Sequence, residues 1–251
     1  MGLELNRALH GVRQGVIGIA EVLNEHSKEL GPALRAAIDV VQQFPGALRV
    51  SLHSLAMQGW YLDPEWPLPT SLDLARQIAD GSKADVSQWL MNHYRSRIDA
   101  FEELLCDRHP KRARILERAF TAHRAGHYEL SVPVLLSQAD GIAHDPCERE
   151  LYSRRHDIGL QGLIDSQGVL ESLFASALAT PSPVNATKNE RGQDFSGLNR
   201  HLVLHGLDVA YGSEENSLKA LSLVNYVSFA LRRRKDLLGS ERGAANGGGG
   251  N

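Results

Sequence analysis

The chain has 251 residues and a formal net charge of −3 at pH 7. Its hydrophobic fraction of 42% and charged fraction of 23% are ordinary for a globular protein, and a chain of this length buries a sizeable core without disulfides or metals. The acidic balance excludes a general attraction to nucleic acid, so any RNA contact must come from a local basic patch. Two candidates are the group Arg108, His109, Lys111, Arg112 and Arg114, and the run Arg232 to Lys235. A pair of solvated helix ends is the alternative interpretation.

The cellular compartment is predicted from the cysteines and from the absence of targeting patterns. Only Cys106 and Cys147 are present, which excludes a disulfide scaffold and favours a reducing compartment. The N-terminal residues lack the uninterrupted apolar core of a secretory signal. No stretch approaches the roughly 18 apolar residues that a membrane span needs. We therefore expect a cytoplasmic protein with no membrane contact.

The first half of the chain is predicted to be helical. Aromatic residues make up only 6% of the chain while Ala, Leu, Arg and Glu are plentiful, which favours helix over strand. The apolar spacing predicts helices over residues 3–26, 32–44, 45–58, 71–80 and 83–106. His109 precedes a proline and so disfavours helix, which places a domain boundary there. The expected organisation is an N-terminal helical region over 1–108, a helical bundle over 109–238 and a disordered glycine-rich tail over 239–251.

Residues 59–71 form an aromatic-rich segment that interrupts these helices. Its sequence, GWYLDPEWPLPTS, contains three prolines, which forbid a regular helix. We expect Trp60, Tyr61 and Trp66 to pack into the bundle, with stacking on a ligand base as the alternative.

The second half of the chain is also predicted to be helical. Helices are expected over residues 111–126, 129–142, 159–179, 195–205 and 214–238. Ser213 is a plausible N-cap for the last of them. Residues 143–158 are expected to be irregular or to contain a short helix, and residues 179–194 to form a polar loop. No convincing strand and no internal repeat is found, so the fold class is all-α.

Common catalytic motifs are absent from the chain. It contains no Walker A sequence, no GxGxxG, no GxSxG and no HExxH. Ordinary nucleotide-dependent enzymes, serine hydrolases and zinc proteases of the HExxH type are therefore not the default classes. We expect no cofactor and no metal.

The most informative segment is Asn199-Arg200-His201-Leu202-Val203-Leu204-His205-Gly206. Arg200 offers a permanent cationic fork for a phosphate. His205 titrates near neutral pH and can move a proton to or from a ribose hydroxyl. His201 lies four residues before His205, on the same helix face. The segment has the groups that phosphodiester cleavage requires.

This Arg-x4-His spacing resembles the R-x4–6-H signature of HEPN domains, and the likeness covers about residues 113–237. The resemblance implies a homodimer in which two Arg/His pairs face one cleft, and a metal-independent endoribonuclease of a prokaryotic toxin or antiviral defence system, with an antitoxin or defence partner protein. It implies catalytic roles for Arg200, His205 and His201, and supporting roles for Asn199 and Asp140. In the family the residue after the arginine is more usually Asn or Asp, whereas here it is His201, with Asn199 before the arginine.

Other interpretations of the same residues stay open. The chain has two further spacings of this kind, Arg118/His123 and Arg149/His156. Arg200 and His205 can instead cap their helix, with Arg200 paired to Asp194 or Asp208. A non-catalytic helical dimer that serves as a binding module is the alternative function. Asp140 is either an acidic partner for the Arg/His site or part of a helix end that Gly141 stops. A zinc site is a further alternative, built from His123, His127, Asp140, His144 and Cys147.

Overall fold

The computed structural model describes residues 32–147, 169–192 and 195–231. Over these ranges the chain folds into helices and connecting loops without a strand, so the all-α prediction is confirmed. The helix predicted over 3–26, most of the segment 143–158 and the glycine-rich tail lie outside the described residues. None of the helices in the described ranges is long and apolar enough to cross a membrane.

Helices account for most of the described residues. They are α2 (Pro32–Met57), α3 (Leu68–Ala79), α4 (Lys83–Ser96), α5 (Ile98–Arg108), α6 (Ala113–Arg124), α7 (Tyr128–Cys147), α9 (Val169–Leu178), the 3₁₀ turn η1 (Pro183–Asn185), α10 (Arg200–Leu204) and α11 (Glu214–Ala230).

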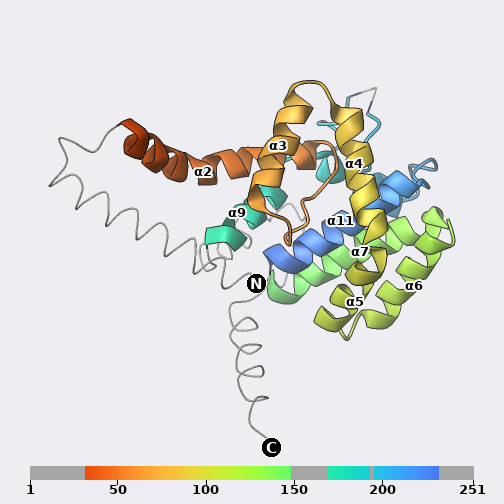
Figure 1. The fold of residues 1–251 in the computed structure, drawn as a ribbon. Helices are drawn as coiled ribbons and strands as arrows, with labels where there is room; N and C mark the ends of the chain where they lie inside the picture. The colour runs from red at the N-terminus through yellow and green to blue at the C-terminus, as the bar shows by residue number, and fades with distance from the viewer. Residues whose placement is uncertain (1–31, 148–168, 193–194, 232–251) are drawn as a thin grey trace, which may run out of the picture.

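Helix α11 forms the centre of the molecule. Every residue from Ala220 to Leu231 is buried, and α11 contacts α4, α5, α7 and α9 (Figure 1). A helix that is enclosed on all sides must be largely apolar around its whole circumference. The polar side chains of α11 between Ala220 and Leu231 are only serine, asparagine and tyrosine. Helices α4 and α5, which precede the predicted domain boundary at residue 108, and helices α7 and α9, which follow it, thus all pack on α11. The domain boundary itself stays a prediction.

Helix α2 corrects the prediction of two helices over 32–44 and 45–58. A single helix runs from Pro32 to Met57 with Pro45 inside it. A proline removes one amide donor and crowds the preceding turn, which is why the sequence suggested a new start. The buried side chains Leu48, Leu52 and Leu55 pack toward α3 and α9, and this burial outweighs the local cost of the proline.

The long helix predicted over 83–106 is in fact two helices. The chain leaves helical geometry at Arg97, with φ −115° and ψ 15°, between α4 and α5. The guanidinium of Arg97 binds Asp63 and Glu65 in the aromatic segment. The apolar spacing passes smoothly across this break, so periodicity alone gave no sign of it.

Two other helix limits also differ from prediction. Helix α3 begins at Leu68 instead of Ser71, because Pro69 occupies its first turn, where the missing amide is not needed. Helix α7 continues past Gly141 to Cys147, so the helix predicted over 129–142 ends too early, and the helix end at Gly141, one of the two interpretations of Asp140, is not observed. Ile142 and Ala143 are buried and extend the packed face of α7, which favours continuation over a glycine stop.

The aromatic segment packs into the bundle as predicted. Trp60 is 0% exposed and Tyr61 is 2% exposed. The indole Nε1 of Trp60 donates to Ser87 Oγ, and the hydroxyl of Tyr61 lies near Ser182 Oγ. Trp66 is only partly buried, and its ring lies against Trp89 of α4. The segment therefore joins α4 and α11 instead of presenting its rings as one open surface.

Candidate functional site

The Arg/His segment forms the short helix α10, which is capped at both ends. Asn199 is the N-cap, since its backbone is extended and its side chain accepts a hydrogen bond from the Leu202 amide. Gly206 follows the C-terminal end with φ 66°, a left-handed conformation that glycine adopts at little cost. The predicted stop at Gly206 is confirmed. The predicted start at residue 195 is wrong, because the Asn199 cap holds the preceding residues out of the helix.

Asn199 is completely buried and fixes α10 to the preceding loop. Its amide nitrogen donates to the carbonyls of Pro183 and Ala186 at 2.8 and 3.0 Å. Its side-chain oxygen also accepts from Arg191 at 3.3 Å. The amide thus has every partner it can use within the fold, and its contacts are those of a structural cap.

Replacement of Asn199 by alanine is expected to lower the free energy of unfolding by about 1–2 kcal/mol, the usual cost of losing an N-cap. Thermal or urea unfolding measures this loss. The matched control is Asn92→Ala, which removes an exposed amide from α4 and should cost much less. Equal losses in the two variants would contradict the capping role.

Arg200 turns toward α7 and forms an ion pair with Asp140. The Nε atom of Arg200 donates to Asp140 Oδ2, and the two side chains are 20% and 15% exposed. The structure therefore brings together two of the predicted site residues from segments 60 positions apart. The alternative pairing of Arg200 with Asp208 is not observed, and Asp194 lies outside the described residues. A largely buried carboxylate that holds Nε restricts the orientation of the guanidinium.

His201 and His205 lie on the solvent side of α10. Both are exposed, and their ring centroids are 4.3 Å apart. Four residues separate them, so successive turns place one ring above the other. The pKa of His201 lies below its usual value, because nearby protein atoms remove part of its solvation and because His205 opposes a second positive charge. His201 is thus biased toward the neutral form, which can accept a proton.

The end of α10 and the loop after it expose several apolar side chains. Leu204, Leu207 and Val209 are 39%, 65% and 91% exposed. Single exposed apolar residues are common, but three within six positions form a local apolar surface beside the two histidines. Tyr211 closes the loop by donating its hydroxyl to the Glu129 carbonyl at the start of α7.

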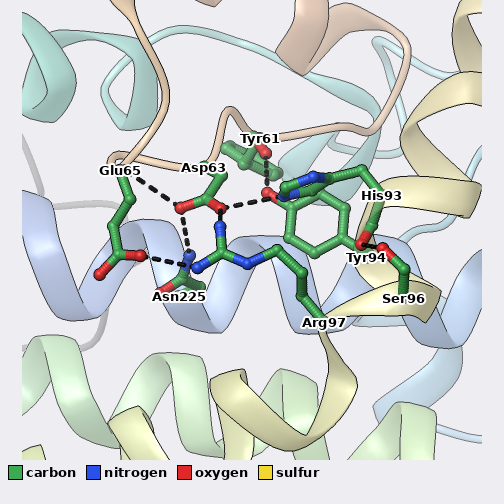
Figure 2. A network of polar contacts seen from close by, with 8 residues as sticks. All are labelled: Tyr61, Asp63, Glu65, His93, Tyr94, Ser96, Arg97 and Asn225. Carbon is green, nitrogen blue, oxygen red and sulfur yellow. Dashed lines mark hydrogen bonds and ion pairs between the residues drawn. The ribbon is translucent and has the colours of Figure 1, made fainter.

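A second polar cluster, which the sequence analysis did not identify, surrounds Asp63 (Figure 2). The Asp63 side chain is 0% exposed, and its Oδ2 lies 2.7 Å from the Arg97 guanidinium and 2.9 Å from His93 Nε2. Its Oδ1 accepts from the Glu65 amide at 3.1 Å and from Asn225 Nδ2 at 3.4 Å. Both carboxylate oxygens are therefore fully hydrogen-bonded, as a buried charge requires.

This cluster has the character of a structural junction. It joins the aromatic segment, α4 and the central helix α11 through one carboxylate. The His93 ring lies under Trp66, with centroids 3.8 Å apart, and is 12% exposed. One sequence signal could have indicated the junction, namely a lone aspartate in the otherwise apolar run Trp60-Tyr61-Leu62-Asp63.

The histidines of the zinc hypothesis do not meet. His123 is buried, and its Nδ1 lies 2.8 Å from Ser217 Oγ, which in turn lies 2.7 Å from Ser131 Oγ. Burial lowers the pKa of His123, which keeps the ring neutral in this network. Across the described ranges no three His, Cys, Asp or Glu side chains gather as metal ligands would.

Comparisons of the chain with protein-family models, with curated proteins and with solved structures found no match. The interpretation of the site therefore depends on its own geometry and chemistry.

Proposed function

We propose that the protein is a metal-independent endoribonuclease whose reacting groups are the two histidines of α10 together with Arg200. The observation that carries the proposal is the exposed ring pair of His201 and His205 at α10, a helix whose first residue, Arg200, is held by Asp140 of α7. Two imidazoles at one exposed point can supply both a general base and a general acid. A cation at the same short helix can stabilise the charge that develops on a phosphate.

The proposed reaction is internal transesterification of RNA. His201, biased toward its neutral form, takes the proton from a ribose 2′-hydroxyl, and the 2′-oxygen attacks the adjacent phosphorus. The bond from phosphorus to the 5′-oxygen of the next nucleotide breaks, and protonated His205 gives that oxygen a proton. Arg200 stabilises the negative charge of the phosphorane. The products are a 2′,3′-cyclic phosphate and a 5′-hydroxyl, so no water or external oxidant enters the balance.

The experiment that tests the proposal is incubation of purified full-length chain with single-stranded RNA in the presence of EDTA. We expect cleavage, with products that carry 2′,3′-cyclic phosphate and 5′-hydroxyl ends. An RNA of the same sequence with 2′-O-methyl riboses should stay intact, because it lacks the attacking hydroxyl. Intact RNA after prolonged incubation with monodisperse, folded protein would contradict the proposal.

The cleavage rate should fall on acidification, with an inflection below the usual histidine pKa of about 6.5. Below its own pKa His201 carries a proton and cannot accept one, so activity is lost as the pH falls through that value. Because the pKa of His201 is lowered, the loss comes at a lower pH than for an ordinary histidine. Replacement of His205 by glutamine removes the neighbouring imidazole that lowers the His201 pKa, so this pKa should rise. Because the variant lacks the proposed general acid, the titration of the His201 ring is followed by NMR and not by the cleavage rate. A His201 pKa that is unchanged in this variant would contradict the coupling between the two rings.

A non-catalytic binding module is the second candidate function. The exposed side chains Leu204, Leu207 and Val209 favour it, because they supply an apolar contact surface next to the histidines. The same surface would support the proposed homodimer, in which two copies of α10 face each other. Light scattering of wild type and of a Leu207→Ser/Val209→Ser variant tests this contact. A dimer that binds RNA and leaves it whole would favour the binding module. The role in a toxin or defence system, with an antitoxin or defence partner protein, stays a prediction from the HEPN resemblance.

A further inference from the structure

Arg191 is a cation next to α10 that the proposed reaction does not use. It ends a tight turn over residues 187–191, in which the amides of Glu190 and Arg191 both donate to the Thr187 carbonyl at 3.1 Å. The Glu190 carboxylate accepts from the amide and the hydroxyl of Thr187, each at 2.8 Å. The nearest carboxylate in the sequence is therefore occupied within the turn and forms no ion pair with the guanidinium beside it.

The cap residue Asn199 holds the Arg191 side chain against α10. Arg191 Nη1 donates to Asn199 Oδ1 at 3.3 Å, and the same oxygen accepts from the Leu202 amide at 3.1 Å. Asn199 is buried, and its amide nitrogen is bound to two loop carbonyls, so it is a fixed anchor. Arg191 itself is only partly buried. Its guanidinium therefore keeps N–H donors that an anion from solvent can reach.

Arg191 also lies close to one of the two exposed histidines. Its positive charge is one of the causes that lower the pKa of His201, after lost solvation and the neighbouring His205. His201 follows the Asn199 anchor by two residues in the chain. A guanidinium and an imidazole that are close enough to repel each other are both stabilised by an anion that lies between them.

The two arginines at α10 differ in what surrounds their charge. Arg200 binds the carboxylate of Asp140, which offsets part of its positive charge. The partner that the described part of the chain gives Arg191 is the neutral amide of Asn199, which orients the guanidinium without cancelling its charge. The Leu202 amide is already bound to Asn199, so side chains and not the backbone of α10 supply the donors for an anion here.

We propose that Arg191 binds a non-bridging oxygen of an RNA phosphodiester and holds that phosphate beside the His201 ring. This inference rests on the proposed function, because it assigns the residue that places the substrate at the α10 site. Arg191 moves no proton and forms no covalent bond. It attracts the phosphate before the reaction begins, so its loss should raise KM more than it lowers kcat.

The first test measures binding of a fluorescein-labelled 2′-O-methyl oligonucleotide by fluorescence anisotropy at several NaCl concentrations. This probe lacks the attacking 2′-hydroxyl, so binding is separated from cleavage. The variant is Arg191→Gln. The matched control is Lys188→Gln, which removes the same charge from an exposed position in the same turn. Arg191→Lys keeps the charge and should recover part of the binding, which a disturbed loop would not allow.

We expect Arg191→Gln to bind more weakly and to lose about 0.7 from the magnitude of the slope of log K against log salt, the value for one single-strand phosphate contact. Lys188→Gln should keep the wild-type slope. With ordinary RNA, Arg191→Gln should show a raised KM and a nearly unchanged kcat. Equal slopes in the two glutamine variants, or a wild-type protein that does not bind the probe, would overturn the inference.

The second test needs no RNA and follows the titration of the His201 ring by NMR. Arg191→Gln should raise the pKa of His201, because a nearby positive charge is gone, whereas Lys188→Gln should leave it unchanged. An unchanged value in Arg191→Gln would show that the guanidinium does not lie beside the ring, which overturns the inference. Cleavage with a wild-type KM in Arg191→Gln would overturn it and leave the proposed function standing. Probe binding that Arg191→Gln weakens, with ordinary RNA left whole by wild type, would sink the proposed function and leave the phosphate contact standing.

Discussion

Replacement of Asp63 by alanine is expected to lower the free energy of unfolding by about 3–5 kcal/mol, the usual cost of breaking a buried ion pair by removing one partner. Asp63 is 0% exposed and accepts four hydrogen bonds from three elements of the fold. Its loss leaves His93 and Arg97 without the carboxylate that compensates them. Urea unfolding followed by circular dichroism measures the change.

The matched control for Asp63 is Glu65→Ala, which removes the other carboxylate that Arg97 binds. Glu65 is 38% exposed, and an exposed ion pair contributes about 0–1 kcal/mol. The Glu65 variant should therefore unfold close to wild type. If the two variants lose the same free energy, the Asp63 cluster is not the junction of the aromatic segment, α4 and α11.

Replacement of Arg200 by alanine is expected to lower kcat for RNA cleavage about 10²–10³-fold, the usual effect of removing one group that stabilises transition-state charge. Asp140 fixes the guanidinium through Nε, so its direction is set before RNA binds. Arg200→Lys keeps the charge and loses the planar fork, and it should recover only part of the rate. Single-turnover kinetics with saturating protein measures both variants.

The control for Arg200 must separate chemistry from folding, because the carboxylate of Asp140 is only 15% exposed and loses its ion pair with Arg200 in the alanine variant. The double variant Arg200→Ala/Asp140→Asn removes that charge and should unfold closer to wild type while it stays inactive. Arg76→Ala, an exposed arginine of α3, should retain full activity. Recovery of cleavage in the double variant would show that Arg200 acts through stability alone.

Sequence patterns predicted the helical class and most helix positions, because apolar spacing reports which side of a helix is buried. The cap at Ser213 and the stop at Gly206 were also predictable, since each is a local hydrogen-bonding or conformational requirement. The helix ends that were predicted wrongly depend on residues distant in the sequence. The break at Arg97 coincides with contacts of its guanidinium to Asp63 and Glu65, more than thirty residues earlier.

The same distinction applies to the candidate site. The sequence indicated that Arg200, His201 and His205 belong to one helix, and Asp140 was one of several acidic partners that it left open. Only the packing of α10 against α7 selects Asp140 over Asp208. Asn199 was expected to support chemistry, but its burial and its contacts to two loop carbonyls give it the role of a cap. The local cap bond to the Leu202 amide was as predictable as the cap at Ser213, because Asn is a favoured N-cap residue. The contacts to Pro183 and Ala186 were not predictable, because these partners come from a loop without periodicity.

The proposal of a reaction centre on α10 is tested most directly by the rate of RNA cleavage in the presence of EDTA. This rate is compared between wild type and the His201→Ala/His205→Ala variant. The matched control is His127→Ala, which removes an exposed histidine outside α10. The account predicts cleavage by wild type and by the control, and a rate lower by at least about 10² in the double variant, because both proton-transfer groups are gone. Equal cleavage by the double variant and wild type would contradict a reaction centre on α10.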